Sequence, residues 1–278
     1  MRACEARAID RGCSSRAAVK AGTEPRVPLR TWVAVGGAML GSFMAVLDIQ
    51  ITNASLENIT SGVGATLDEG SWISVSYLTA EIIVIPLCGW LSSVFGLRRY
   101  LVWNSALFLL FSVLCGAART LDSLVVFRAA QGFTGGAFIP MASTMVITLL
   151  PPSKQPVGFA MFAMTAMFAP AIGPTVGGWI TDAFGWPCVF YLNLLPGVVF
   201  LWAVGWGLAG SPARIDLLRR GDWAGITLMA AGLGCLTVLL EEGTRKDWFG
   251  SPMIVRLAVV AAVSLPAFVW LQLHLRRN

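Results

Sequence analysis

The sequence has little charge, almost no histidine and no organised cysteine. Only 13% of its residues are charged, His274 is its single histidine, and its six cysteines show no C-x-x-C spacing. These features argue against a zinc site, a haem or a disulfide framework, so we expect no metal and no cofactor. The basic residues are dispersed over loops, which argues against a nucleic-acid surface. A membrane enzyme is also disfavoured, because no constellation of histidine, cysteine and acidic residues is present.

Long hydrophobic runs are abundant instead. Hydrophobic residues make up 56% of the chain, more than one soluble core of this size can bury. Crossing a hydrocarbon layer of about 30 Å takes about 20 helical residues. Eight continuous runs are long enough: 32–53, 72–93, 101–118, 123–150, 157–181, 189–209, 223–240 and 252–274. Their continuity favours helices over an outer-membrane barrel. The sequence therefore predicts an all-α, multi-pass protein of about eight spans in a lipid bilayer.

The distribution of Lys and Arg predicts the orientation. Eight spans place fifteen Lys and Arg residues on the side of the two termini and four on the other side. Because basic loops stay in the cytoplasm, we expect both termini to be cytoplasmic. Residues 1–31 lack the apolar run of a secretory signal. We interpret them as a disordered basic cytoplasmic tail, or as an overextended start.

The charged residues Asp48, Glu81 and Arg128 lie well inside the hydrophobic runs. A charge deep in a bilayer costs at least about 2.5–3.5 kcal/mol, so such residues usually face a cavity or one another. Asp48 lies five residues before the outer end of the first span, and Arg128 five residues into the inward-running fourth span. Equal depth predicts that they pair. The alternative is that Arg128 extends to the interface and Asp48 caps a helix end.

Glu81 lies about nine residues below Trp72, near the predicted midplane. Burial favours the neutral, protonated form of a carboxyl group unless a cation is close by. Glu81 is therefore a candidate to bind a proton or a cationic substrate. The structural alternative is a protonated Glu81 that is hydrogen-bonded to a neighbouring helix.

Residues 89–99, GWLSSVFGLRR, resemble the cytoplasmic loop signature of the major facilitator superfamily. Gly89, Gly96, Arg98 and Arg99 match this signature, whose glycines form a tight turn between spans two and three. Ser93 stands where the family has an acid, which puts the charge relay of that loop in doubt. Taken alone, this stretch would be explained better as a polar hairpin that follows the positive-inside rule.

Two further stretches strengthen the resemblance. Residues 124–136, LVVFRAAQGFTGG, match the fourth-span pattern through Arg128 and the glycines. Residues 169–178, APAIGPTVGG, resemble the antiporter signature of the fifth span, with Ala169 replacing the usual glycine. Its matching residues include Gly173, Pro174, Gly177 and Gly178. Gly173 and Gly177 are one turn apart and permit close approach of another helix, while the prolines can bend their own helix.

Residues 47–54, 186–196 and 222–225 resemble the fourteen-span drug:proton antiporters of the Emr/Qac type. The resemblance implies a six-helix N-terminal bundle over 32–209, a cytoplasmic linker over 210–221 and two additional transmembrane helices in 222–278. The C-terminal bundle of that branch is absent. We therefore expect either a truncated transporter or, alternatively, a non-transporting remnant or a subunit that needs a second chain. By itself the chain is expected to bind poorly and not to transport.

The resemblance also implies a function. It predicts proton-coupled efflux of amphipathic drugs across the bacterial cytoplasmic (inner) membrane. Asp48 would be the proton-coupling acid, Arg128 the charge that tunes it, and Glu81 a site for substrate or proton. A periplasmic adaptor and an outer-membrane channel are the partners that the resemblance suggests.

Overall fold

A computed structural model describes residues 27–219 and 221–275, and within them the secondary structure is entirely helical. The elements are α2 (Leu29–Ala54), α3 (Leu56–Gly62), α4 (Leu67–Val84), η1 (Ile85–Leu87), α5 (Cys88–Phe95), α6 (Leu97–Gly116), α7 (Leu121–Gly135), α8 (Phe138–Leu149), α9 (Gln155–Phe184), α10 (Pro187–Tyr191), α11 (Leu194–Gly207), α12 (Asp216–Arg219), α13 (Trp223–Glu242), η2 (Trp248–Gly250) and α14 (Pro252–Leu275).

Among the described residues, eight helical segments are long and apolar enough to cross a membrane. They are α2, α4–η1–α5, α6, α7–α8, α9, α10–α11, α13 and α14. All eight predicted spans are thus present, and the predicted all-α membrane fold is confirmed. The third span begins at Leu97, four residues before the predicted start, and the first begins at Leu29, inside the predicted tail. The rest of that tail, residues 1–26, lies outside the described residues, as do Arg276 and Arg277.

Three spans are interrupted part-way. The second is broken by η1, where Pro86 removes a backbone donor. The fourth is broken between Gly135 and Phe138, and the sixth between Tyr191 and Leu194. These breaks matter for the site, because two of them lie next to Glu81 and the third includes Asn193.

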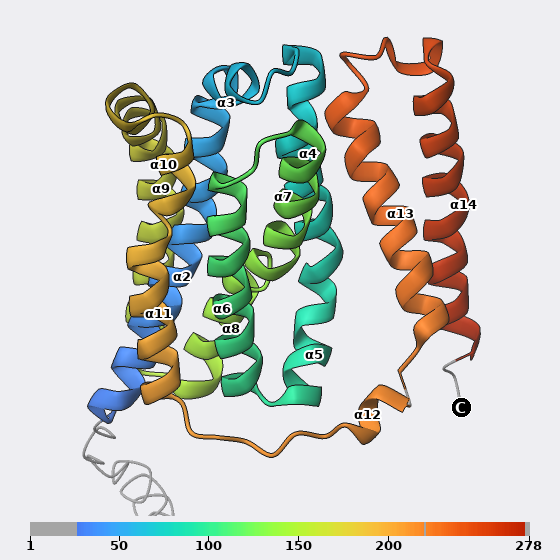
Figure 1. Cartoon of the computed structure of the whole chain (residues 1–278). Helices are drawn as coiled ribbons and strands as arrows, with labels where there is room; N and C mark the ends of the chain where they lie inside the picture. Colours follow the sequence, from blue (N-terminus) through green and yellow to red (C-terminus); the bar gives the residue numbers. More distant parts are fainter. Residues whose placement is uncertain (1–26, 220, 276–278) are drawn as a thin grey trace, which may run out of the picture.

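The first six spans form a bundle around α2, which packs against α9, α11 and α8 (Figure 1). On the other side of the bundle, α7 packs against both α4 and α6. The core that joins these layers contains three aromatic rings in edge-to-face contact. The Phe138 ring lies 5.3 Å from that of Phe108 and 5.0 Å from that of Phe200, between centroids. Such contacts fix the relative positions of spans three, four and six.

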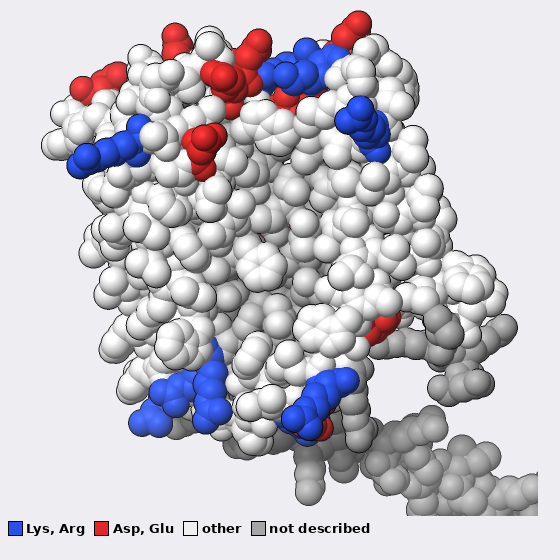
Figure 2. All heavy atoms as spheres, turned by 45° about the vertical axis from the view of Figure 1, so that its right-hand side comes forward, with Lys and Arg blue, Asp and Glu red and all other residues white. Residues whose placement is uncertain are grey.

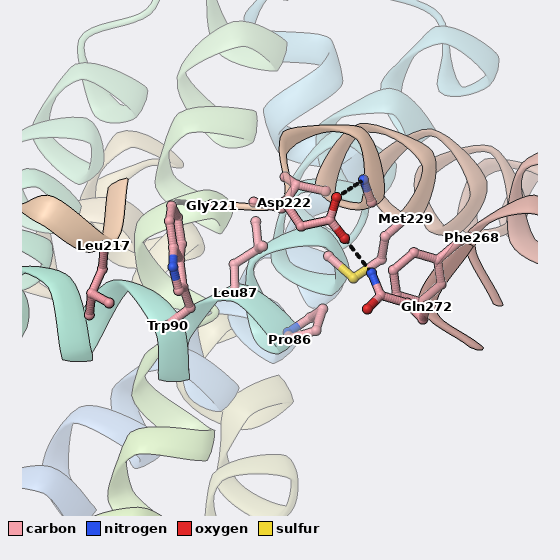
Figure 3. A pocket seen from close by; sticks show the side chains of 11 residues that line it. Pro86, Leu87, Trp90, Leu217, Gly221, Asp222, Met229, Phe268 and Gln272 are labelled. Carbon is pink, nitrogen blue, oxygen red and sulfur yellow. Dashed lines mark hydrogen bonds between the residues drawn. The ribbon is translucent and has the colours of Figure 1, made fainter. Parts of the chain in front are cut away.

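The last two spans, α13 and α14, form a hairpin that stands beside α4 (Figure 1). The segment from α11 to α13 crosses one end of the bundle, where the Arg214 N–H donates to the Val94 carbonyl at 2.7 Å. Asp222 caps α13 by accepting from the Gly225 N–H at 2.9 Å, and Gln272 of α14 donates to the other oxygen of the same carboxylate (Figure 3). A cavity of about 370 Å³ lies next to these residues.

Charged side chains gather at the two ends of the molecule, with an uncharged belt between them on the face that Figure 2 shows. Such a belt is the surface that a bilayer requires. The end where α2 begins carries mostly basic residues. The opposite end, where α4 and α7 begin, carries most of the acids.

Candidate functional site

Asp48 of α2 and Arg128 of α7 form a buried ion pair. The Arg128 Nη1 atom lies 2.5 Å from the Asp48 Oδ2 atom, and their side chains are 1% and 0% exposed. The pairing expected from equal depth is therefore present. Arg128 does not extend to the surface, and Asp48 does not cap a helix end, since α2 continues beyond it to Ala54. A buried charge requires such a partner, because an unpaired one would be strongly destabilising.

Two amides complete the hydrogen bonds of the Asp48 carboxylate. Gln131, one turn beyond Arg128, donates from Nε2 to Asp48 Oδ1 at 3.2 Å and accepts from Arg128 Nη1 at 2.8 Å. Asn193 donates from Nδ2 to the same Oδ1 atom at 2.5 Å. The carboxylate of the first span thus accepts from three donors on the fourth and sixth spans. Hydrogen bonds of this kind, to a charged carboxylate, are stronger than those between neutral groups.

Aromatic rings enclose the Arg128 guanidinium. Its Cζ atom lies 4.2 Å from the centroid of the Tyr77 ring and 5.7 Å from that of Phe190. Arg128 also donates from Nε to the Ile73 carbonyl at 3.4 Å. These contacts favour a cation that has lost its water. They tie the ion pair to the second span as well as to the sixth.

Glycines on α7 explain why the second and fourth spans lie so close. A Cβ atom added to Gly132 would lie 2.9 Å from the Tyr77 Cα atom, and one on Gly136 would lie 2.9 Å from the Glu81 Cα atom. Only residues without a side chain allow this approach. The glycines of the fourth-span pattern therefore bring Arg128 against Tyr77 and place the break after Gly135 beside Glu81.

Glu81 is buried, with 7% of its surface exposed. Its carboxyl group makes no hydrogen bond or ion pair with any residue that the structure describes, so the expected alternative of a hydrogen bond to a neighbouring helix is not observed. It is close enough to Arg128 and Asp48 to interact with both charges. Its role as a site for substrate or proton stays a prediction.

The antiporter signature divides into two faces. Gly173 and Gly177 face α2, where added Cβ atoms would lie 2.5 Å from Gln50 Cβ and 3.0 Å from the Ile51 carbonyl oxygen. Pro174 is exposed. A Cβ atom added to Gly178 would have no described atom within 4 Å apart from its chain neighbours and the nearby backbone of its own helix. The signature therefore brings the fifth span against the first, next to the segment that carries Asp48.

In the loop signature, only one glycine has the expected turn role. Gly96 adopts a φ of 81° at the junction of α5 and α6, and an added Cβ would lie 2.9 Å from the Ser211 carbonyl oxygen. Gly89 lies inside α5, so the prediction that it forms the turn is wrong. Ser93 donates to the Gly89 carbonyl of its own helix at 2.9 Å. Arg98 and Arg99 are exposed at the same end of the bundle.

Sequence reasoning assigned no role to Gln131 or Asn193. A signal was present for Gln131, because it lies three residues after Arg128 and therefore on the same helical face. Asn193 is a polar residue in an otherwise apolar run, and a buried amide needs hydrogen-bond partners just as a buried charge does. Among the described residues, no group of histidine, cysteine and acidic side chains is arranged to hold a metal ion.

The sequence profile of the Major Facilitator Superfamily matches residues 38–277. The chain belongs to this superfamily. Among its relatives in the superfamily, the multidrug export protein EmrB of Haemophilus influenzae is 37% identical over 230 residues, which cover 83% of this chain and 45% of that protein. The colistin resistance protein EmrB of Acinetobacter baumannii is 39% identical over 241 residues, covering 86% and 47%. The chain thus spans under half the length of these relatives.

The fold agrees with that of a solved peptide transporter. The crystal structure of the peptide transporter POT in complex with sulfate superposes with a TM-score of 0.63, at 17% identity, over 88% of this chain and 53% of that one. At this identity the likeness concerns the fold alone. The eight apolar helices among the described residues and the superfamily match establish a multi-pass membrane protein.

Proposed function

We propose that this chain acts in proton-coupled export of amphipathic drugs across the bacterial inner membrane, as a transporter and not an enzyme. The observation that carries the proposal is the Asp48–Arg128 pair, which is sealed between three spans and held by amide donors. The names of the relatives, multidrug export and colistin resistance proteins, support the substrate class.

The geometry suggests how a proton could alter the packing of the helices. The ionised Asp48 attracts donors from the fourth and sixth spans to the first span. A proton on Asp48 would remove the charge with which Arg128 pairs, and it would leave the buried guanidinium without its ion-pair partner. The first span and the other two would then no longer be held in the same arrangement. Such a two-state contact is what alternating access requires of a coupling site.

Glu81 supplies a second buried acid that is close enough to Arg128 and Asp48 to interact with both charges. Because its carboxyl group has no hydrogen-bond partner among the described residues, it has acceptor oxygens left to bind a cation or a proton. A cationic drug and a proton would compete for it, since both neutralise the same charge. Mutually exclusive binding of this kind couples the export of one to the entry of the other.

The proposal includes an orientation with both termini in the cytoplasm, because Lys and Arg are more numerous at that end. It also includes a periplasmic adaptor and an outer-membrane channel as partners, which rest on the resemblance to the drug:proton antiporter branch alone.

Substitution Asp48→Asn tests the proposed role in a transporter completed with the C-terminal bundle of the Haemophilus influenzae relative. We expect the variant to insert normally but to lose drug-driven proton release, because the amide cannot carry the proton. Release is measured with a pH indicator when tetraphenylphosphonium is added to the detergent-solubilised protein. Asp182→Asn, at an exposed position near the end of α9, is the matched control. Unchanged proton release in Asp48→Asn would refute the role of this carboxyl group.

A further inference from the structure

We propose that Asn193 is a positioning residue that holds Asp48 in its ionised form and opposes its protonation. This inference rests on the proposed function of Asp48 as the proton-coupling acid. It adds a residue of the sixth span to a site that the sequence places on the first and fourth spans. Asn193 is 2% exposed.

The orientation of the Asn193 amide follows from its second partner. Asn193 Nδ2 donates to Ser112 Oγ at 3.0 Å, and the Ser112 hydroxyl donates its proton to the Phe190 carbonyl at 2.7 Å. Because that proton is committed, the Ser112 oxygen can only accept from Asn193. The NH₂ group of Asn193, and not its carbonyl oxygen, therefore faces both Ser112 and Asp48. Toward Asp48 this residue can only donate.

A contact that can only donate favours the carboxylate over the carboxylic acid. Asp48 Oδ1 accepts from both Gln131 and Asn193, and Oδ2 accepts from Arg128. A proton on Oδ1 has to displace one of the two amides. A proton on Oδ2 removes the charge that Arg128 needs. Asn193 therefore contributes directly to the free energy that a proton has to overcome at this site.

The backbone around Asn193 is consistent with this role. Asn193 lies in the break of the sixth span, at the N-cap position of α11, where asparagine usually accepts a hydrogen bond from the first turn. Its side chain makes no such bond here. The amide instead points to Asp48 and Ser112. The break in the helix therefore orients the Asn193 side chain toward the carboxylate.

The substitution Asn193→Leu in the 278-residue chain tests the proposal. It keeps a branched side chain but removes the donor. We expect the carbonyl stretch of protonated Asp48, recorded by infrared difference spectroscopy in detergent, to appear at a pH about one unit higher than in the wild type, a tenfold gain in proton affinity. The band is assigned by its loss in the double variant with Asp48→Asn. Asn193→Ala tests the same point if leucine prevents folding.

Asn104→Leu is the matched control, since Asn104 is also a buried asparagine, on the third span, but is not among the described hydrogen-bond partners of Asp48, which are Arg128, Gln131 and Asn193. It should leave the Asp48 band at its wild-type pH, even if it lowers the unfolding temperature as much as Asn193→Leu does. A shift of equal size in the control, or no shift in either Asn193 variant, would overturn the proposal and leave Asn193 with a packing role only.

This measurement needs neither substrate nor transport. A shifted band together with normal proton release in Asp48→Asn would show that Asn193 positions an acid that does not couple drug export. An unshifted band with lost release would reject the role of Asn193 alone.

Discussion

The side chains of Asp48 and Arg128 are almost completely buried, and this affects what their ion pair can do. Desolvating two charges costs several kcal/mol per ion, which their attraction barely repays, whereas removal of one partner costs about 3–5 kcal/mol. The ion pair therefore adds little to the stability of the fold, but loss of its charge has a large effect on the packing of the helices. A single proton converts the satisfied arrangement into an unsatisfied one, and the helices that carry the donors have to respond.

Glu81 should distinguish substrates by charge. In the completed transporter, we expect Glu81→Gln to lower efflux of a cationic dye about tenfold, because a contact between a cation and a carboxylate contributes about 1.5–3 kcal/mol. Efflux of a neutral drug should change less than about twofold. Both are measured in vesicles with and without a pH gradient, and Glu241→Gln at an exposed position is the control. Equal loss for both substrates would contradict a charge-selective role.

The residues of the site differ in how far the sequence could predict them. The pairing of Asp48 with Arg128 could be predicted because each residue of a helix advances about 1.5 Å, so position in a span gives depth. Asn193 could not be placed in this way. The direction of the Asn193 side chain depends on a break in the sixth span. An amide also carries no charge, so its burial does not require an oppositely charged partner.

At the scale of the helix, the small-residue signatures predict close packing but not the partner. The glycines of α7 pack against α4, and those of α9 pack against α2. Both outcomes satisfy the same pattern of residues one turn apart. Which helix packs against the glycines depends on the arrangement of all six spans, and one sequence stretch does not contain that information.

Gly173 and Gly178 allow this packing to be tested within one helix. Gly173→Ala should destabilise the chain by about 1–3 kcal/mol, because the new methyl group would overlap Gln50 Cβ and force α2 and α9 apart. Gly178→Ala meets no neighbour, so it should leave stability unchanged or raise it by up to about 1 kcal/mol through helix propensity. Thermal unfolding in detergent, followed by circular dichroism, measures both. Equal unfolding temperatures for the two variants would count against the α2–α9 contact.

At the scale of the whole molecule, the α13–α14 hairpin is fixed to the bundle at both ends. Near one end, Arg245 donates to the Asp68 carbonyl at the start of α4, and its Nη2 atom lies 3.3 Å from Asp68 Oδ1. Near the other, the Trp223 ring meets the Trp90 ring edge to face at 5.9 Å. The sequence predicted two additional spans. Their position beside α4 follows from these few long-range contacts, which hydrophobic periodicity does not encode.

The distribution of charge predicts how the molecule sits in the membrane. Within the described residues, the end where α2 begins has six Lys and Arg and two acids, whereas the opposite end has four Lys and Arg and eight acids. Since Lys and Arg are retained in the cytoplasm, the end with Arg99 should be cytoplasmic and the end with Glu57 periplasmic. Both positions are exposed, so each can be replaced singly, as Arg99→Cys and Glu57→Cys. In intact cells a membrane-impermeant maleimide should label only Glu57→Cys above the level of the parent chain, and lysis should expose both. Labelling of Arg99→Cys in intact cells would reverse the orientation, and with it the direction of export that the site is proposed to drive.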